Sequence, residues 1–233
     1  AAKRDAAERQ GYTVVDCQTI IATHLTEIIK AHAAEILGRQ EVQDLIDSIK
    51  KDHPAVVDDL LGSKRLSLGG IQKVLQNLLR EHVSIRNMVS IMETLANYSE
   101  GSEGPSMLTE CVRAALARQI CREYSGAGNS LAVITVDPEI ESTLRNSIHD
   151  DPVEGKVLGL EPEAHEQIMT ALLNSYRTAR NAGHMAIYLV SPHIRSVTFA
   201  LLEREVKDAV VLSYNEIVPT VRVSVLTSAV IAA

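Results

Sequence analysis

The sequence predicts an α+β protein of several subdomains, in which an all-helical subdomain is followed by a small α/β subdomain with a mostly parallel sheet. Three observations predict this fold class. Apolar residues recur with a helical period up to about residue 98, without a strong strand pattern. A small, polar segment at 99–106 breaks this pattern. Beyond residue 130, short apolar and β-branched runs alternate with helical segments, as in a parallel sheet buried on both faces.

Two helices are expected at the start of the chain. Asp16 is a good N-cap for a helix over 16–37, in which isoleucine and leucine keep a helical spacing. Residues 40–51 predict a second helix with apolar and charged side chains on opposite faces. His53-Pro54 is expected to end it, because a residue that precedes proline avoids the helical region.

A loop and three further helices complete the helical half. The segment GSKRLSLGG at 62–70 is rich in small and polar residues, which predicts a loop. A helix is expected over 71–81, and Ser84 is expected to cap the next one, whose apolar stripe begins at Ile85. After the small polar break, one helix is expected over 106–124.

Four strands and three helices are expected in the second half. The helix after the first strand is predicted to start at Asp137-Pro138, with Asp as N-cap and Pro at the first helical position. The last strand alternates apolar and polar residues, which is typical of a half-exposed edge strand. The expected strands are 131–136, 186–191, 208–214 and 220–227, and the other helices are 162–182 and 193–204.

Composition argues against several classes of function. The 233 residues include 23 Lys and Arg against 30 Asp and Glu, a net charge of −7, which is unsuited to non-specific nucleic-acid binding. Six Tyr, one Phe and no Trp leave little material for stacking on bases. The three cysteines form no CxxC pair, and the polar start of the chain is unlike a signal peptide. Apolar stretches are too short for a membrane helix. Because the first residue is Ala1 and not Met, we expect a fragment that begins inside a larger protein.

One repeated motif suggests a metal site. An H-x-x-E pattern occurs twice on the first helix, as His24 with Glu27 and His32 with Glu35, and residues three apart share a helix face. A carboxylate-bridged metal site needs such pairs from several helices, and no second helix supplies one. We therefore favour two surface His–Glu pairs, and keep a metal-dependent hydrolase that uses these four residues as an alternative.

The other candidate sites have simpler interpretations. The sequence contains neither a GxSxG nucleophile elbow nor a Walker A loop. The segment at 125–129 predicts a helix-ending turn, and residues 149–151 predict an acidic loop. Glu163, His165 and Glu166 are expected to be solvated groups on one helix. We therefore expect no catalytic residue, no cofactor and no metal, and a protein that is not an enzyme.

An apolar surface at the start of the first helix is the best candidate for a binding site. Val15 precedes the Asp16 cap, and Ile20 lies one turn into the helix. Ala22 and Thr23 keep this face small. A shallow apolar dimple with a hydroxyl group at its rim would suit a docked helix or peptide of a partner. Ordinary packing into a core is the alternative.

Five segments carry a resemblance to a known family. Over about residues 5–227, the chain resembles the cytoplasmic region of the type III secretion export-gate family, with the segments in the same order and spacing. Of the two branches of this family, flagellar and injectisome, the flagellar branch is the more similar. The segments are GYTVVD at 11–16, IIATHL at 20–25, LGRQEVQDLID at 37–47, IQKVLQNLL at 71–79 and VVLSYNEI at 210–217.

The resemblance implies an organisation into subdomains. Residues 1–36 would be the remnant of the first cytoplasmic subdomain, with its terminal helix. Residues 37–116 would form the helical third subdomain, and residues 117–233 the α/β fourth subdomain. The full-length protein would be integral to the bacterial inner membrane through an N-terminal part absent here, and this fragment would be a soluble portion on the cytoplasmic face.

The resemblance also implies partners and a site. Members of the family bind export chaperone–substrate complexes and the export ATPase complex including its stalk protein, and their cytoplasmic regions self-associate into a nine-fold ring. The functional threonine of the family's docking dimple matches Thr23, and lining apolar positions match Val15 and Ile20. Cys17 and Ser84 stand where the family often has proline. Since the other partners of the dimple belong to the missing second subdomain, the chain is expected to hold half of the site.

The sequence therefore predicts a non-enzymatic docking and gating module of a type III protein export apparatus, with flagellar biogenesis as the process. Two alternatives stay open beside the hydrolase. One is an export-gate ring component of an injectisome for virulence secretion, and the other is a purely structural ring element whose exposed faces meet only neighbouring copies. No nucleic-acid partner is expected, and membrane contact is expected only through the missing N-terminal part.

Overall fold

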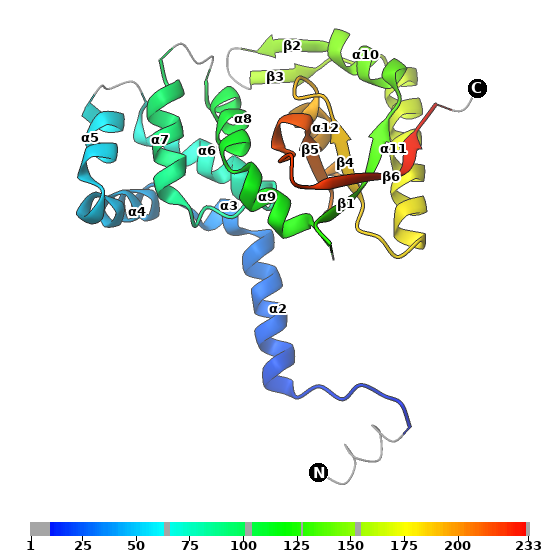
Figure 1. Cartoon of the computed structure of the whole chain (residues 1–233), viewed down its shortest axis with the longest axis horizontal. Coiled ribbons are helices and arrows are strands. Elements are labelled where there is room, and N and C mark those ends of the chain that lie inside the picture. Colours follow the sequence, from blue (N-terminus) through cyan, green and yellow to red (C-terminus); the bar gives the residue numbers. More distant parts are fainter. Residues whose placement is uncertain (1–9, 63–65, 101–103, 127, 152–154, 232–233) are drawn as a thin grey trace.

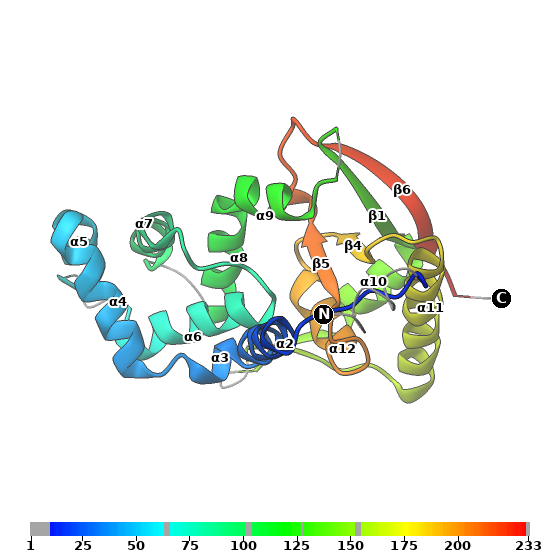
Figure 2. The ribbon, with the colours of Figure 1, turned by 90° about the horizontal axis from the view of Figure 1, so that it is seen from below.

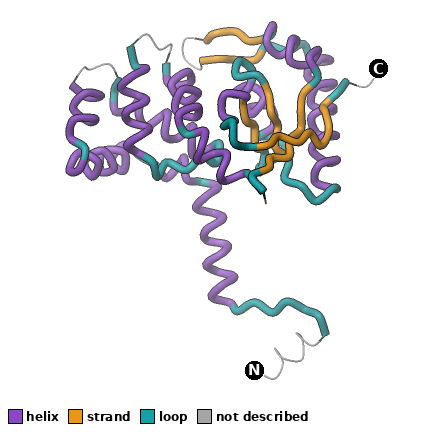
Figure 3. Tube along the Cα trace, in the orientation of Figure 1, coloured by secondary structure: helices purple, strands orange, loops and turns teal. Residues whose placement is uncertain are grey.

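Helices form the N-terminal half of the molecule, and strands are concentrated in the C-terminal half (Figure 3). The structure is a computed structural model that describes residues 10–62, 66–100, 104–126, 128–151 and 155–231. Its helical array and its four-stranded parallel sheet confirm the predicted α+β class.

Helix α2 (Cys17–Ala31) projects away from the rest of the molecule (Figure 1). Asp16 caps it as predicted, because its Oδ1 accepts a hydrogen bond from Thr19 N at 2.9 Å and its Oδ2 accepts one from the Thr19 hydroxyl at 2.7 Å. The helix expected over 16–37 is not continuous. It is interrupted at His32, and the short helix α3 (Ala33–Ile36) follows.

The helical array consists of five helices that lie side by side on one side of the molecule (Figure 1). Their apolar faces are buried against one another. Helical spacing of apolar residues predicted this for all of them except α5, a helix that the sequence did not lead us to expect. They are α4 (Arg39–Asp52), α5 (Pro54–Gly62), α6 (Leu68–Arg80), α7 (Met88–Tyr98) and α8 (Pro105–Ala115).

The predicted cap of α7 is wrong. The N-cap is Asn87, whose Oδ1 accepts a hydrogen bond from Ser90 N at 3.4 Å. Ser84 lies in the connection before α7, where its Oγ accepts a hydrogen bond from Arg86 N at 3.4 Å. Both side chains are suitable caps, so the sequence did not distinguish them.

Two other boundaries differ from the prediction. The loop expected over 62–70 extends too far, because Ser67 caps α6 and Leu68 already belongs to it; residues 63–65 lie outside the described residues. The single helix expected over 106–124 is two helices, α8 and α9 (Ala117–Tyr124), which meet at the buried Leu116.

The main sheet has four strands, and all of its pairings are parallel. In the order β5–β4–β1–β6, its strands are β5 (Val210–Ser213), β4 (Ile187–Val190), β1 (Ser130–Val136) and β6 (Arg222–Ala229). β6 lies at an edge, as its alternating sequence predicted, and Val225 is 60% exposed there.

Three helices and a hairpin surround the sheet. Asp137 caps α10 as predicted, because its Oδ1 accepts a hydrogen bond from Glu139 N at 2.9 Å. The helices are α10 (Pro138–Asn146), α11 (Pro162–Asn181) and α12 (Arg195–Leu202), and the 3₁₀ turn η1 (Tyr214–Glu216) follows β5. Residues 149–151, expected as a loop, instead belong to β2 (Ile148–Asp151), which pairs antiparallel with β3 (Gly155–Leu158). Its polar sequence carried no strand signal.

Each face of the sheet carries an apolar core. On one face, side chains of β1, β4 and β5 join the core of the helical array; they are Leu131, Val133, Ile187, Leu189, Val210 and Leu212. On the other face, the sheet packs against α10, α11 and α12 through Ile134, Val136, Tyr188, Val190 and Val211. The sheet thus lies between the helical array and α11, on opposite sides of the molecule (Figure 2).

Truncation of a residue that joins the sheet to the helical array is expected to destabilise the protein. Leu131→Ala removes a fully buried side chain, so the free energy of unfolding should fall by about 2–5 kcal/mol. Leu25→Ala is the matched control, because Leu25 on α2 is 54% exposed and its truncation should change stability by less than about 0.5 kcal/mol. Urea denaturation measures both. Equal losses would contradict the burial of Leu131.

Removal of the α2 cap is expected to fray the helix. The Thr19 hydroxyl and then the Thr19 amide hold the pKa of Asp16 below its ordinary value, so the charged cap stabilises α2 above the ordinary pKa and is lost as pH falls through the lowered one. Asp16→Ala should reduce the helicity of residues 17–25 in NMR chemical shifts. Asp16→Asn keeps an oxygen acceptor, so it should retain more helix and lose the pH dependence. Identical losses in the two variants would contradict capping.

Candidate functional site

The three residues of the expected docking dimple are all accessible to solvent. Val15 is 45% exposed immediately before the Asp16 cap, Ile20 is 54% exposed one turn into α2, and Thr23 is exposed in the next turn. No residue of α2 is buried, and these three residues belong to neither apolar core cluster of the described structure. A surface of apolar side chains with one hydroxyl group can bind a partner through shape and apolar contacts.

A second apolar surface, the α2 stripe, runs along the same helix. It is formed by side chains that are 44–66% exposed: Ile21, Leu25, Ile28 and Ile29. Since an α-helix turns by about 100° per residue, Thr23 lies on nearly the opposite side of α2 from the centre of this stripe. Ile20 lies between Thr23 and the stripe. Helix α2 therefore presents two distinct surfaces.

The histidine and glutamate residues of the repeated motif do not form a common site. His32 Nδ1 lies 3.2 Å from Glu35 Oε2 on the surface, whereas Glu27 Oε1 accepts a hydrogen bond from Lys30 Nζ at 3.1 Å. Among the described residues, no group of three or more His, Cys, Asp or Glu side chains is arranged to hold a metal ion. The geometry therefore gives no support to a hydrolase that uses His24 with these residues.

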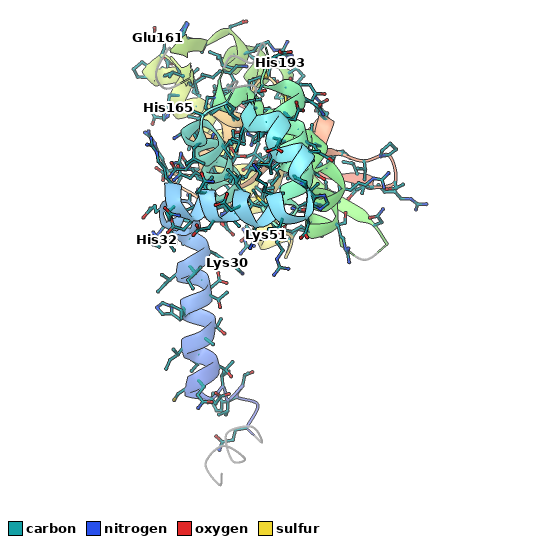
Figure 4. The ribbon with its side chains drawn as sticks, turned by 90° about the vertical axis from the view of Figure 1, so that its left-hand side faces the viewer. Lys30, His32, Lys51, Glu161, His165 and His193 are labelled. Atoms are coloured by element: carbon teal, nitrogen blue, oxygen red, sulfur yellow. The ribbon has the colours of Figure 1, made fainter. Side chains whose placement is uncertain are left out.

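The acidic groups of the second half lie elsewhere. Glu161 and His165, at the start of α11, are at the opposite end of the molecule from α2, far from Lys30 and His32 (Figure 4). Both side chains are exposed, as expected of solvated groups at the start of a helix.

The structure reveals a feature that the sequence analysis missed, which we name the charge cluster. It consists of two buried arginines and three glutamates, namely Arg113, Arg195, Glu81, Glu110 and Glu216. The partners are separated by 32 to 114 residues in the sequence, so no local motif indicates the cluster. Arg113 and Arg195 lie in helices that also contain other polar residues, so their sequence context gives no signal of the cluster.

Within the described part of the chain, no helix combines the length and the apolar character that crossing a membrane requires.

Comparison with known sequences identifies relatives along nearly the whole chain. The profile of the FHIPEP family matches residues 1–222. The chain is 40% identical over 222 residues to the flagellar biosynthesis protein FlhA of Bacillus subtilis, covering 95% of this chain and 32% of the relative. It is 42% identical over 222 residues to FlhA of Treponema pallidum, covering 94% and 31%. The chain thus spans about a third of the length of the curated relatives that it matches.

Solved structures of similar fold cover the chain equally well. The Chlamydia pneumoniae CdsV protein superposes with a TM-score of 0.87 and 26% identity, over 98% of this chain and 65% of CdsV. A structure of CdsV in complex with CdsO gives the same TM-score and identity, over 97% of this chain and 65% of the CdsV chain. The nonameric SctV-C of EPEC gives a TM-score of 0.83 and 30% identity, over 97% and 68%.

The order of the motifs, the two-part architecture and these matches lead to one conclusion: the chain belongs to the FHIPEP family, which includes the flagellar FlhA proteins of type III export gates.

Proposed function

We propose that the chain is part of the cytoplasmic docking and gating region of a type III export gate, and that α2 supplies half of a docking site for export chaperone–substrate complexes. The observation that carries this proposal is the exposure of Val15, Ile20 and Thr23 at the start of α2, with Thr23 on nearly the opposite side of the helix from the α2 stripe. One helix can thus contact a docked partner on one side and other parts of the longer protein through the stripe.

The flagellar branch is favoured over the injectisome branch. Identity to the two flagellar relatives is 40% and 42%, whereas identity to CdsV and SctV-C is 26% and 30%. We therefore propose flagellar biogenesis as the process that this chain serves.

The proposed docking site is incomplete in this chain, and its affinity is expected to be modest. Val15 and Ile20 offer a small apolar area, and Thr23 adds one hydroxyl group that can donate or accept a hydrogen bond. A surface of this size does not support tight binding without further contacts from the partner surface that the rest of the protein provides. Modest affinity suits an export gate, since docked cargo has to be released.

Further partners follow from what the related structures contain. The CdsV–CdsO complex supports an interaction with a second protein of the secretion apparatus, and we propose the export ATPase complex including its stalk protein as this partner. The nonameric SctV-C supports self-association into a nine-fold ring. We further propose that the longer protein is anchored in the bacterial inner membrane with this part on its cytoplasmic side. The subdomain boundaries would be 1–36, 37–116 and 117–233, and the junction of α8 and α9 at Leu116 supports the second boundary.

A charge placed on the proposed docking surface is expected to abolish binding. Thr23→Asp introduces a carboxylate that a docked apolar partner would have to desolvate, so affinity for a flagellar chaperone–substrate complex should fall at least tenfold, or about 1.4 kcal/mol. Isothermal titration calorimetry on the complete cytoplasmic region measures this, because the present chain holds only half of the site.

Two control variants make this test specific. Thr178→Asp places the same charge at an exposed threonine of α11 and should leave the affinity unchanged. Thr23→Ser retains the hydroxyl group and should bind with nearly the native affinity. Circular dichroism establishes that the Thr23→Asp variant is folded. Unchanged affinity of a folded Thr23→Asp variant would overturn the site.

A docking module and a purely structural ring element are expected to behave differently in solution. Analytical ultracentrifugation of the complete cytoplasmic region, with and without a chaperone–substrate complex, separates the two. We expect concentration-dependent self-association and, in addition, co-sedimentation with the chaperone–substrate complex. Self-association without any response to the chaperone would favour the structural element.

A further inference from the structure

The helical array and the α/β part do not have separate apolar cores. One core cluster includes residues of α4 to α9 together with residues of β1, β4 and β5, so it crosses the junction at Leu116. Leu131, Val133 and Leu212 contribute to it from β1 and β5. Any rotation of the two parts about Leu116 would expose these apolar side chains to water.

An arginine of the helical array reaches into the α/β part at this junction. Arg113 of α8 is 2% exposed, and its Nη2 donates hydrogen bonds to Glu216 Oε2 at 2.6 Å and to the carbonyl oxygen of Val211 at 3.2 Å. The other carboxylate oxygen of Glu216 accepts hydrogen bonds from Ser213 N at 3.0 Å and from Ser213 Oγ at 2.8 Å. The acceptor is therefore held rigidly on η1.

An arginine of the α/β part reaches in the opposite direction. Arg195, the first residue of α12, is fully buried and binds two carboxylates of the helical array. Its Nη1 and Nη2 donate to Glu81 Oε2 and Oε1 at 2.8 and 3.0 Å, and its Nε donates to Glu110 Oε2 at 2.6 Å. A second hydrogen bond joins Arg195 Nη2 to Glu110 Oε1. Such bidentate hydrogen bonding fixes the orientation of a guanidinium group.

Glu81 links the two arginines. It ends α6, and its Oε2 accepts hydrogen bonds from Arg195 Nη1 and from Arg113 Nη1, the latter at 2.6 Å. Burial alone would raise the pKa of Glu81, but the charges of Arg195 and Arg113 outweigh it and hold the pKa below its ordinary value. Glu81 is therefore ionised at neutral pH, and both arginines are held by the same carboxylate.

We propose that the charge cluster is a latch that locks the helical array and the α/β part into one rigid body. Arg195 of the α/β part binds two carboxylates of the helical array, and Arg113 of the array binds Glu216 and the Val211 carbonyl of the α/β part. A relative displacement would therefore break charged hydrogen bonds of both arginines at once. A buried charge that loses its partner is strongly disfavoured, which makes the latch either closed or fully broken. Domain movements of the longer protein consequently occur outside this interface.

The latch can be tested by a distance measurement between the two parts. Spin labels are attached to cysteines that replace Asn97 on α7 and Arg177 on α11. Both positions are exposed, and they lie on opposite sides of the interface. Cys17 and Cys111 are replaced by serine to avoid unwanted labelling, whereas Cys121 is buried. Double electron–electron resonance on the otherwise native chain should give one narrow distance distribution. Two populations, or one broad distribution, would overturn the latch.

Removal of Arg195 should open the latch. In Arg195→Met, Glu110 loses its arginine and Glu81 keeps only Arg113, which it shares with Glu216, so a second population at a different distance should appear. Lys50→Met is the control, because it removes the exposed ion pair with Asp58 within the helical array and should leave the distribution narrow. An Arg195→Met distribution as narrow as the native one would contradict the proposal.

A milder variant covers the case in which Arg195→Met does not fold. Arg195→Lys keeps the charge but cannot bridge Glu81 and Glu110 with a planar fork, so it should broaden the distribution. Hydrogen exchange of residues 211–216 provides an independent readout. Exchange of these residues should be faster in Arg195→Lys than in Lys50→Met. If Arg195→Lys exchanges at the same rate as Lys50→Met and also keeps the native distance distribution, the latch is overturned.

Discussion

The packing of one face of the β-sheet against the helical array is the interaction on which the rest of the structure depends. Alternate residues of β1, β4 and β5 face the array, and the intervening residues face α10, α11 and α12. Strands buried on both faces cannot be separated from either layer without exposing apolar surface, at a cost of about 25 cal/mol per Å². The junction between α8 and α9 is therefore a change of architecture rather than a flexible linker.

Local chemistry accounts for what the sequence could predict. The β-branched run at 131–136 cannot form an amphipathic helix, and it is a buried strand in the structure. The Asp16 and Asp137 caps and the exposed edge strand β6 likewise follow from neighbouring residues. The polar strand β2 escaped prediction because its stability comes from pairing with β3 and not from an apolar pattern of its own.

The charge cluster shows why long-range features are invisible to the sequence. Arg195 and Glu81 are 114 residues apart, and each alone looks like an ordinary charged group at a helix end. The candidate docking site differs in this respect. Val15, Ile20 and Thr23 are close in sequence, so helical spacing alone places Ile20 and Thr23 on neighbouring turns, and the structure adds their exposure. Which partner they bind stays a prediction, because half of the proposed site lies outside this chain.

The contrast between α2 and the rest of the molecule has a physical consequence for an export gate. Helix α2 has no buried residue, whereas the rest of the molecule has an apolar core shared by the helical array and the sheet, and a buried charge cluster. Loss of one partner from such a buried ion pair typically costs about 3–5 kcal/mol, and a bound ligand offsets such a cost only by the difference between its affinities for the two arrangements. Under the docking that we propose, a partner that contacts α2 alone has no such difference in affinity, so it can shift the position of α2 relative to the rest of the molecule without rearranging that remainder. In the nine-fold ring that we propose, the rest of the molecule would then transmit such a shift to neighbouring copies as a rigid element.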